Sequence, residues 1–193
     1  MGEAATPTMP GPIELFGVGL GESLGALSRV ADRDWSAPAG TLDWSCWQTV
    51  DHVTDCLFSY SLQLAGRVRD GWLRLTELHA QPDATPSQLV EALGAVGRTF
   101  EAVLAAAPAD AVASDTIFDL RPSDWAARAL NELLLHTYDV LVGLGDEFEP
   151  SRAVCSFVLS TPTLWMYDGV ERLDVPDPWR TMLVGSGRPT SRD

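Results

Sequence analysis

The segment 123–143 repeats its apolar residues at the three- and four-residue spacing of an α-helix. Glu132 and His136 lie within it, and their spacing places both side chains on one face, one turn apart. Such a pair can bind one metal ion together. With a third ligand it would form the three-ligand site with an open position that is typical of a catalytic metal. The spacing alone is equally compatible with a chance pair on an ordinary helix.

Apolar spacing, helix-start signals and helix breakers predict an all-α fold, most simply a four-helix bundle with extra short helices. Thr85 and Pro86 mark one helix start, as N-cap and first helical residue. No alternating apolar pattern indicates a β-strand. The helices are expected at about 13–31, 46–66, 86–107 and 123–143, with a fifth that opens at Pro150-Ser151 and runs to about Tyr167.

One domain is expected, because a chain of 193 residues with 46% apolar residues can bury a sizeable core. Residues 13–173 are assigned to the helical domain. Residues 1–12 are rich in Pro and Gly and are expected to be frayed. Residues 174–193 contain several Pro and Gly and are predicted to be an irregular tail. Residues 67–80 are compatible with either a continued helix or a short turn.

The chain is strongly acidic, with 27 Asp and Glu residues against 13 basic ones and a net charge of −14. This charge disfavours binding to nucleic acid and to anionic membranes. It either only keeps the protein soluble or favours neutral or cationic ligands. All basic residues are Arg, and Ala is abundant, a composition that suggests a GC-rich bacterial source such as an actinobacterium.

The three cysteines, Cys46, Cys56 and Cys155, have no CxxC spacing and argue against a disulfide scaffold. A reducing cytoplasm is therefore the expected compartment. The sequence also lacks a signal-peptide pattern and an apolar run long enough to span a membrane.

Glu132 and His136 belong to a polar stripe, a row of polar side chains along one side of segment 123–143 beside its apolar face. A similar polar stripe on another segment supplies a candidate for the third ligand. On a helical wheel, segment 46–66 places His52 and Cys56 on an arc beside its apolar face. If this helix faces segment 123–143, then His52, Glu132 and His136 form a His₂Glu set with an open position for water or substrate. A lone His beside an apolar face is more often a satisfied core or rim histidine, so the spacing leaves that alternative open.

Asp139 and Arg128 share the stripe with Glu132 and His136. Asp139 could accept a hydrogen bond from His136 and orient its imidazole, or it could be an ordinary surface acid. Arg128 could steady an anionic group of a substrate, but an i,i+4 ion pair with Glu132 is the simpler account.

The remaining candidate site residues also have ordinary structural explanations. Cys56 could be an extra ligand or a pocket thiol, although a buried apolar cysteine is the commoner case. His79 is interpreted as a surface or capping histidine. Trp47, Trp125 or Trp165 could line an aromatic pocket.

Two stretches resemble motifs of the DinB-like, mycothiol-dependent maleylpyruvate isomerase superfamily. Residues 44–53, WSCWQTVDHV, are similar to its motif W-[ST]-x₆-H-[LV]. Residues 132–139, ELLLHTYD, are similar to the end of its second motif, E-[LI]-x₂-H-T-[WY]-D, with Ala126 and Arg128 ahead of it. The run 177–189 resembles the short ending with Gly-Arg that single-domain members carry. The resemblance covers residues 13–189.

The resemblance implies a four-helix bundle that binds a divalent metal, often Zn²⁺, through the positions of His52, Glu132 and His136. A His₂Glu set also suits Ni²⁺, Fe²⁺ or Mn²⁺. Gln48 departs from the family pattern, which usually has an aspartate there. The longer isomerases have a second domain that this chain is too short to contain, so maleylpyruvate isomerisation itself is not expected.

The family includes transferases and isomerases that use a low-molecular-weight thiol such as mycothiol on a small-molecule substrate. A free thiol has a pKa of about 8.5, and coordination to a metal deprotonates it for attack on an electrophilic carbon. One alternative is a metal-dependent lyase, hydrolase or cyclase that uses no thiol. Another is a non-catalytic module that binds a small ligand or a metal. The sequence leaves the substrate, the metal and the formation of a homodimer open.

Overall fold

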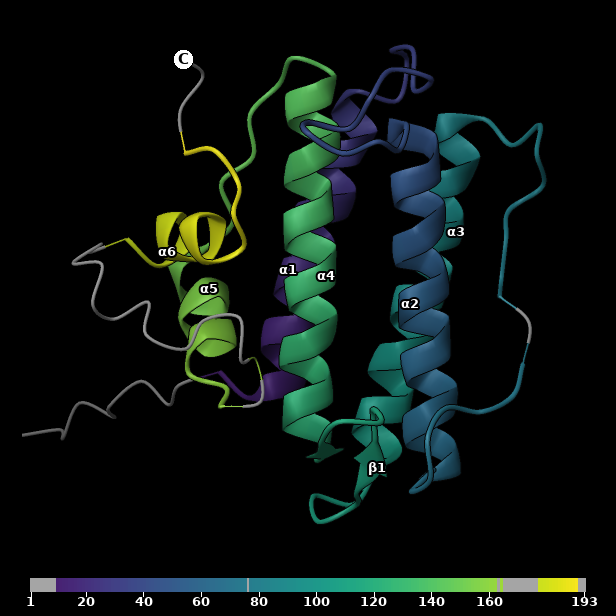
Figure 1. Cartoon of the computed structure of the whole chain (residues 1–193), viewed down its shortest axis with the longest axis vertical. Coiled ribbons are helices and arrows are strands. Elements are labelled where there is room, and N and C mark those ends of the chain that lie inside the picture. The colour runs from purple at the N-terminus through teal and green to yellow at the C-terminus, as the bar shows by residue number, and fades with distance from the viewer. Residues whose placement is uncertain (1–9, 76, 163, 165–176, 191–193) are drawn as a thin grey trace, which may run out of the picture.

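The computed structural model describes residues 10–75, 77–162, 164 and 177–190. These residues form an all-α fold with one small two-stranded sheet (Figure 1). The elements in chain order are α1 (Pro12–Arg29), α2 (Cys46–Gly66), α3 (Pro86–Ala106), β1 (Ala113–Ser114), β2 (Asp119–Leu120), α4 (Pro122–Gly143), α5 (Arg152–Leu159) and α6 (Pro178–Gly185).

The four long helices lie side by side, with α1 and α2 each packed against both α3 and α4. In Figure 1, α2 and α3 run in the same direction, so residues 67–85 must travel the length of the helices to join them. Helix α4 runs antiparallel to α2 and packs against it. The two helices that carry the polar stripes are therefore neighbours.

Capping boxes fix the starts of α2 and α3. The Ser45 side chain accepts a hydrogen bond from the backbone N–H of Gln48, and the Gln48 side chain accepts one from the backbone N–H of Ser45. Thr85 and Gln88 repeat this arrangement, with Pro86 as the first helical residue. The predicted N-cap at Thr85 is confirmed. Gln48, the departure from the family motif, has a capping role here.

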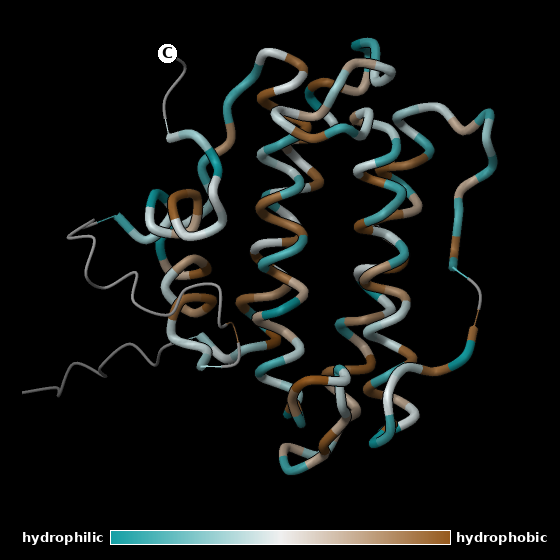
Figure 2. The backbone as a smooth tube through the Cα atoms, viewed as in Figure 1, coloured by the Kyte–Doolittle hydropathy of each residue, from teal (hydrophilic) through white to brown (hydrophobic). Residues whose placement is uncertain are grey.

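Hydrophobic residues recur along all four long helices (Figure 2), and those that point inward form one core. Phe16 of α1 and Phe100 of α3 meet edge to face at its centre, with ring centroids 5.0 Å apart. Leu57 of α2 and Leu130 and Leu133 of α4 are fully buried. Burial of these apolar faces sets the rotation of each helix about its axis, which directs the polar stripes of α2 and α4 toward the rim of the core.

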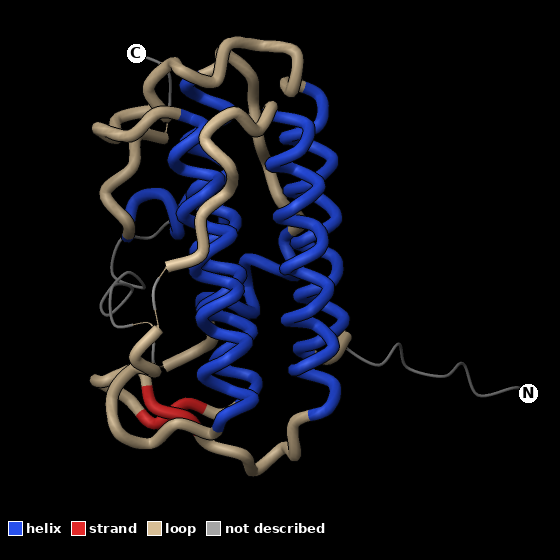
Figure 3. Tube along the Cα trace, turned by 90° about the vertical axis from the view of Figure 1, so that its right-hand side faces the viewer, coloured by secondary structure: helices blue, strands red, loops and turns tan. Residues whose placement is uncertain are grey.

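A short β-hairpin closes one end of the molecule, where the sequence predicts no strand (Figure 3). Ala113 pairs with Leu120 and Ser114 with Asp119 in antiparallel register. The Asp115 carboxylate accepts hydrogen bonds from the backbone N–H groups of the two residues before β2 and so closes the turn. Strands of two residues are too short to produce an alternating pattern, which is why the prediction is wrong here.

The fifth helix is shorter than predicted and ends at Leu159 rather than at about Tyr167. The hydroxyl groups of Ser160 and Thr161 both donate to the carbonyl of Phe157, and Thr161 precedes a proline, which disfavours helical geometry. Residues 165–167 lie outside the described residues.

The predicted irregular tail is also wrong, because residues 178–185 form α6. The Asp177 carboxylate caps this helix by accepting from the N–H groups of Trp179 and Arg180, and Pro178 is its first residue. Helix α6 packs against α5, and α5 in turn packs against α1 and α4 (Figure 1). The Pro residues that indicated an irregular segment therefore include one that begins a helix.

Two further expectations have simple outcomes. Of the predicted frayed segment 1–12, residues 1–9 lie outside the described residues, and Pro12 already belongs to α1. Within 67–80, the described residues continue α2 no further than Gly66. Throughout the described residues, the helices all fall short of the length and apolarity needed to cross a membrane.

The end of α4 packs closely on the loop before α2. A Cβ atom at Gly143 would overlap the carbonyl oxygen of Pro38 and would lie 2.9 Å from the backbone nitrogen of Gly40. We predict that Gly143→Ala lowers the free energy of unfolding by about 1–3 kcal/mol, the usual cost of overpacking. Urea unfolding followed by circular dichroism measures it.

Gly21→Ala is the matched control, because Gly21 is an exposed residue of α1 with no atom within 4 Å of its added Cβ. This change should raise the free energy of unfolding by about 0.5–1 kcal/mol through the lower entropy of the unfolded chain. Equal effects at both positions would contradict the close contact at Gly143.

Candidate metal centre

Glu132 and His136 face each other across one turn of α4. The His136 Nε2 atom lies 3.5 Å from Glu132 Oε2, and both side chains are mostly buried. Their position beside the core follows from the buried leucines that precede and follow Glu132 in α4. The helical spacing in the sequence thus correctly predicts that these two side chains converge.

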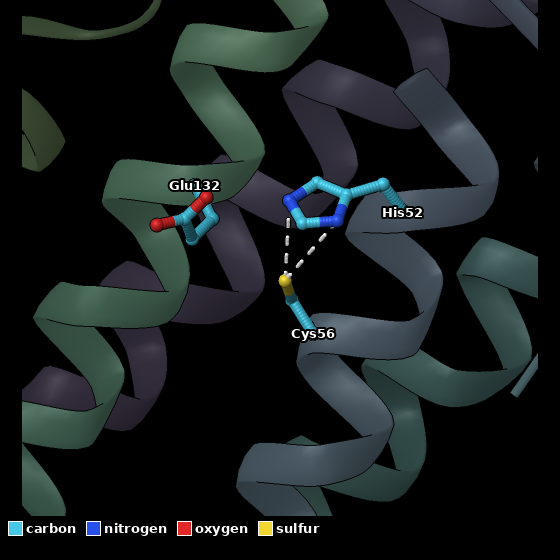
Figure 4. A group of neighbouring side chains, drawn as sticks. All are labelled: His52, Cys56 and Glu132. Atoms are coloured by element: carbon cyan, nitrogen blue, oxygen red, sulfur yellow. Dashed lines mark hydrogen bonds between the residues drawn. The ribbon is translucent and has the colours of Figure 1, made fainter. Parts of the chain in front are cut away.

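His52 of α2 completes this constellation from the opposite side. Its ring centroid lies 5.4 Å from that of His136, and the two ring planes are nearly perpendicular. The ligand atoms of His52, Cys56 and Glu132 all lie within 4.8 Å of one another, so this group could hold a metal ion. Figure 4 shows Glu132 on α4 across from the two side chains of α2.

Cys56 is a member of this compact group, whereas His136 adjoins it through Glu132. The Cys56 Sγ atom lies 3.5 Å from His52 Nε2, and the residue is only partly buried. The favoured interpretation of Cys56 as a buried apolar residue holds only in part, because Cys56 packs against the core but is partly exposed and its sulfur also faces an imidazole. The apolar neighbours of Cys56 in the sequence conceal that its sulfur points at an imidazole.

Asp139 holds the other nitrogen of His136. Its Oδ2 atom lies 3.1 Å from His136 Nδ1, and its side chain is almost fully buried. With a proton on Nδ1, the imidazole donates to Asp139 and presents Nε2 toward Glu132. Of the two predictions for Asp139, the structure supports the orienting role.

Arg188, after α6, secures Asp139 in turn. Its Nε and one terminal nitrogen donate to the two Asp139 oxygens at 2.8 and 2.6 Å. This two-point contact compensates a buried carboxylate. The sequence analysis missed Arg188 because it treated the tail as irregular, although the Gly187-Arg188 pair was part of the family resemblance.

Arg128 lies away from its predicted partner. Its guanidinium pairs with Asp115 of the hairpin at 2.5 Å and stands over the Tyr60 ring, 5.9 Å from the ring centroid. The expected ion pair with Glu132 is therefore wrong. The side chain of Asp115 is completely buried, so it needs a cationic partner more than the partly exposed Glu132 does.

The protonation states of His52 and Glu132 suit a cation. His136 must first release its proton, because its hydrogen bonds outweigh burial and raise its pKa. Burial and then the nearby His136 lower the pKa of His52, which favours its neutral form. Burial alone would raise the pKa of Glu132, but the hydrogen bond and charge of His136 outweigh it and lower the pKa. Neutral imidazole and ionised carboxylate are the forms that bind metals.

Two cavities adjoin the group. The larger, about 700 Å³, is lined by His52 together with Trp44, Trp47 and several acidic side chains. The smaller, about 400 Å³, is lined by Glu132 and His136. The His52 side chain is thus accessible from the larger cavity, whose volume suits a small-molecule ligand.

The aromatic wall differs in part from the prediction. Trp47 lines the larger cavity as expected, but Trp125 is fully buried against Tyr60 and does not line it. Trp165 lies outside the described residues. Trp44 was missed as a wall residue; its ring centroid lies 4.8 Å from that of His52. Its exposed position in a loop gave no periodic signal.

His79 is an exposed histidine, as predicted. Its Nδ1 atom lies 2.8 Å from Asp51 Oδ2, and Asp51 also accepts a hydrogen bond from the backbone N–H of Ala80. Asp55 accepts another from the backbone N–H of Leu78. These contacts fasten the long connection between α2 and α3 along α2, where it forms one wall of the larger cavity.

Comparison with known proteins places the chain beside none of them: no family model, no curated protein and no solved structure matches it.

The pKa of His136 in the metal-free protein tests its hydrogen bonds to Asp139 and Glu132. Burial opposes its protonation, but the hydrogen bonds to Asp139 and Glu132 outweigh burial and raise its pKa above 6.5. We predict that Asp139→Asn lowers this pKa, as measured by NMR titration of the imidazole Cε1–H signal. Asp55→Asn, on the far side of His52, should leave it unchanged.

The raised pKa of His136 also makes the stability of the metal-free fold depend on pH. The folded-state pKa of His136 lies above the unfolded value, so protonated His136 stabilises the metal-free fold at pH below that value. The contribution is lost as the pH rises through the folded-state pKa. A His136 pKa that is insensitive to Asp139→Asn would contradict the orienting contact.

Proposed function

We propose that this chain is a metal-dependent enzyme of small-molecule metabolism with a DinB-like helical bundle. His52, Glu132 and His136 would hold a divalent metal, most simply Zn²⁺. The observation that carries the proposal is the convergence of two imidazoles and a carboxylate from neighbouring helices, with His52 at the edge of one cavity and Glu132 and His136 at the edge of another.

The donor set fits a divalent cation. Two imidazole nitrogens and a carboxylate oxygen are the ligands of many catalytic zinc sites, and they also suit Ni²⁺, Fe²⁺ and Mn²⁺. Asp139 engages the distal nitrogen of His136, the arrangement by which proteins fix the ring and tautomer of a metal-binding histidine. Without a cation, the ionised Glu132 would face only His136 and the neutral His52.

The reaction we propose is a thiol-dependent transfer or isomerisation, with mycothiol or a similar small thiol as co-substrate. A divalent metal would supply the thiol with a lowered pKa and so provide a thiolate for attack on an electrophilic carbon. The motif resemblance at 44–53 and 132–139 supports this choice among the reactions open to a His₂Glu site.

The cavity residues would select and shield the substrate. Trp44 and Trp47 offer apolar faces that exclude water beside His52. Asp51, Asp55 and Glu77 line the same cavity, so a neutral or cationic substrate is favoured over an anionic one. The same negative charge disfavours nucleic acid and anionic membranes as partners. The free cysteines accord with a reducing, cytoplasmic location.

The test compares wild type, His52→Ala and His79→Ala, all purified without a His-tag. We expect about one divalent metal ion per wild-type chain by elemental analysis, and a loss of tenfold or more in metal affinity for His52→Ala, since a direct ligand matters at least as much as a supporting residue. Wild type should also consume mycothiol when an electrophile is supplied. His52→Ala should not.

His79→Ala is the matched control, because it removes an exposed imidazole that contacts Asp51 rather than the metal group. It should retain metal, and only its metal content is compared, because His79 also lines the larger cavity. Turnover that persists without any thiol would replace the thiol reaction by a metal-dependent hydrolase, lyase or cyclase. Metal binding without any turnover would favour a non-catalytic module, and absence of stoichiometric metal would overturn the proposal.

A further inference from the structure

Cys56 of α2 has surroundings unlike those of a structural thiol. Cys56 follows His52 by one turn, and its sulfur lies 3.5 Å from His52 Nε2 (Figure 4). It is also within 4.8 Å of a Glu132 oxygen. By contrast, the fully buried Cys46 directs its sulfur at the backbone carbonyls of Pro38 and Val140, both 3.8 Å away.

The contacts of Cys56 are those of a ligand set. An imidazole nitrogen and a carboxylate oxygen approach the sulfur from two helices, and a third donor, His136, adjoins the carboxylate. Imidazole, carboxylate and thiol atoms that lie within 4.8 Å of one another are typical of a coordination site. Hydrophobic packing gives no reason for the sulfur to face these polar atoms.

We propose that the Cys56 thiolate is a further protein ligand of the metal, on the same ion as His52 and Glu132. This inference rests on the proposed function, since it assumes the metal site. The Cys56 S–H bond breaks when the sulfur becomes a ligand; its proton passes to solvent and the sulfur electron pair forms the new bond. No oxidant or reductant is required.

The free thiol would not ionise unaided. Burial, together with the nearby Glu132 charge, raises the pKa of Cys56 to about 12, so the metal-free protein carries the thiol at neutral pH. A cation reverses this balance by favouring the thiolate. If His136 beside Glu132 also bound the ion, Cys56 would bring the protein donors to four, the number found in closed zinc sites. An incoming ligand must then expand the coordination or displace a protein ligand.

A sulfur ligand also changes which metals the site prefers. Thiolate is a soft donor that favours Zn²⁺ and Co²⁺ over Mn²⁺ and Mg²⁺. A site of His52, Glu132 and His136 alone would discriminate less between these ions.

The experiment titrates the metal-free full chain with Co²⁺ and records absorption spectra. Wild type should show an intense near-ultraviolet thiolate-to-cobalt charge-transfer band beside the weaker visible bands of the bound ion. Cys56→Ser should lose the charge-transfer band and retain the visible bands. Cys155→Ala is the matched control, because this cysteine lies in α5 and outside the metal group; it should retain both.

The spectrum of wild type can already overturn the inference, even if a variant fails to fold. Visible bands without a charge-transfer band would overturn Cys56 as a ligand and leave the proposed metal site intact. A charge-transfer band that persists in folded Cys56→Ser would also overturn it. Absence of any bound Co²⁺ would overturn both this inference and the metal site on which it rests.

Discussion

The buried carboxylate of Asp139 is the constraint on which the site depends. A carboxylate removed from water costs several kcal/mol unless charged or hydrogen-bonding partners compensate it. Arg188 supplies two hydrogen bonds from the segment after α6, and His136 supplies a third contact from the same helix. One buried charge therefore connects the end of the chain, the α4 backbone and the orientation of an imidazole.

The packing of α2 against α4 brings the oriented imidazole of His136 opposite the other candidate ligands. Because His136 is held from behind by Asp139, its free nitrogen faces Glu132, and both lie opposite His52 and Cys56 of α2. The core leucines set the rotation of both helices, so the ligand geometry depends on apolar burial as well as on polar contacts. A rigid pair of helices can position ligands more precisely than loops can.

Helical periodicity placed Asp139 near His136 but left its role open, and it gave no sign of the contacts that Cys56 makes. His52, Glu132 and His136 could all be placed from their positions on two wheels, because residues on one helix have a fixed relation. Arg188 and Trp44 could not, since each reaches the site from a segment without periodicity. The partner of Arg128 depended on a hairpin too short to leave a pattern.

X-ray absorption at the zinc edge of the metal-loaded wild-type protein tests the central claim most directly, because it reports the atoms bound to the ion. The account predicts a coordination shell that contains about two imidazole rings, recognised by their multiple scattering, in keeping with His52 and His136 as ligands. A shell of oxygen atoms without imidazole scattering would contradict it, since the ion would then be bound elsewhere.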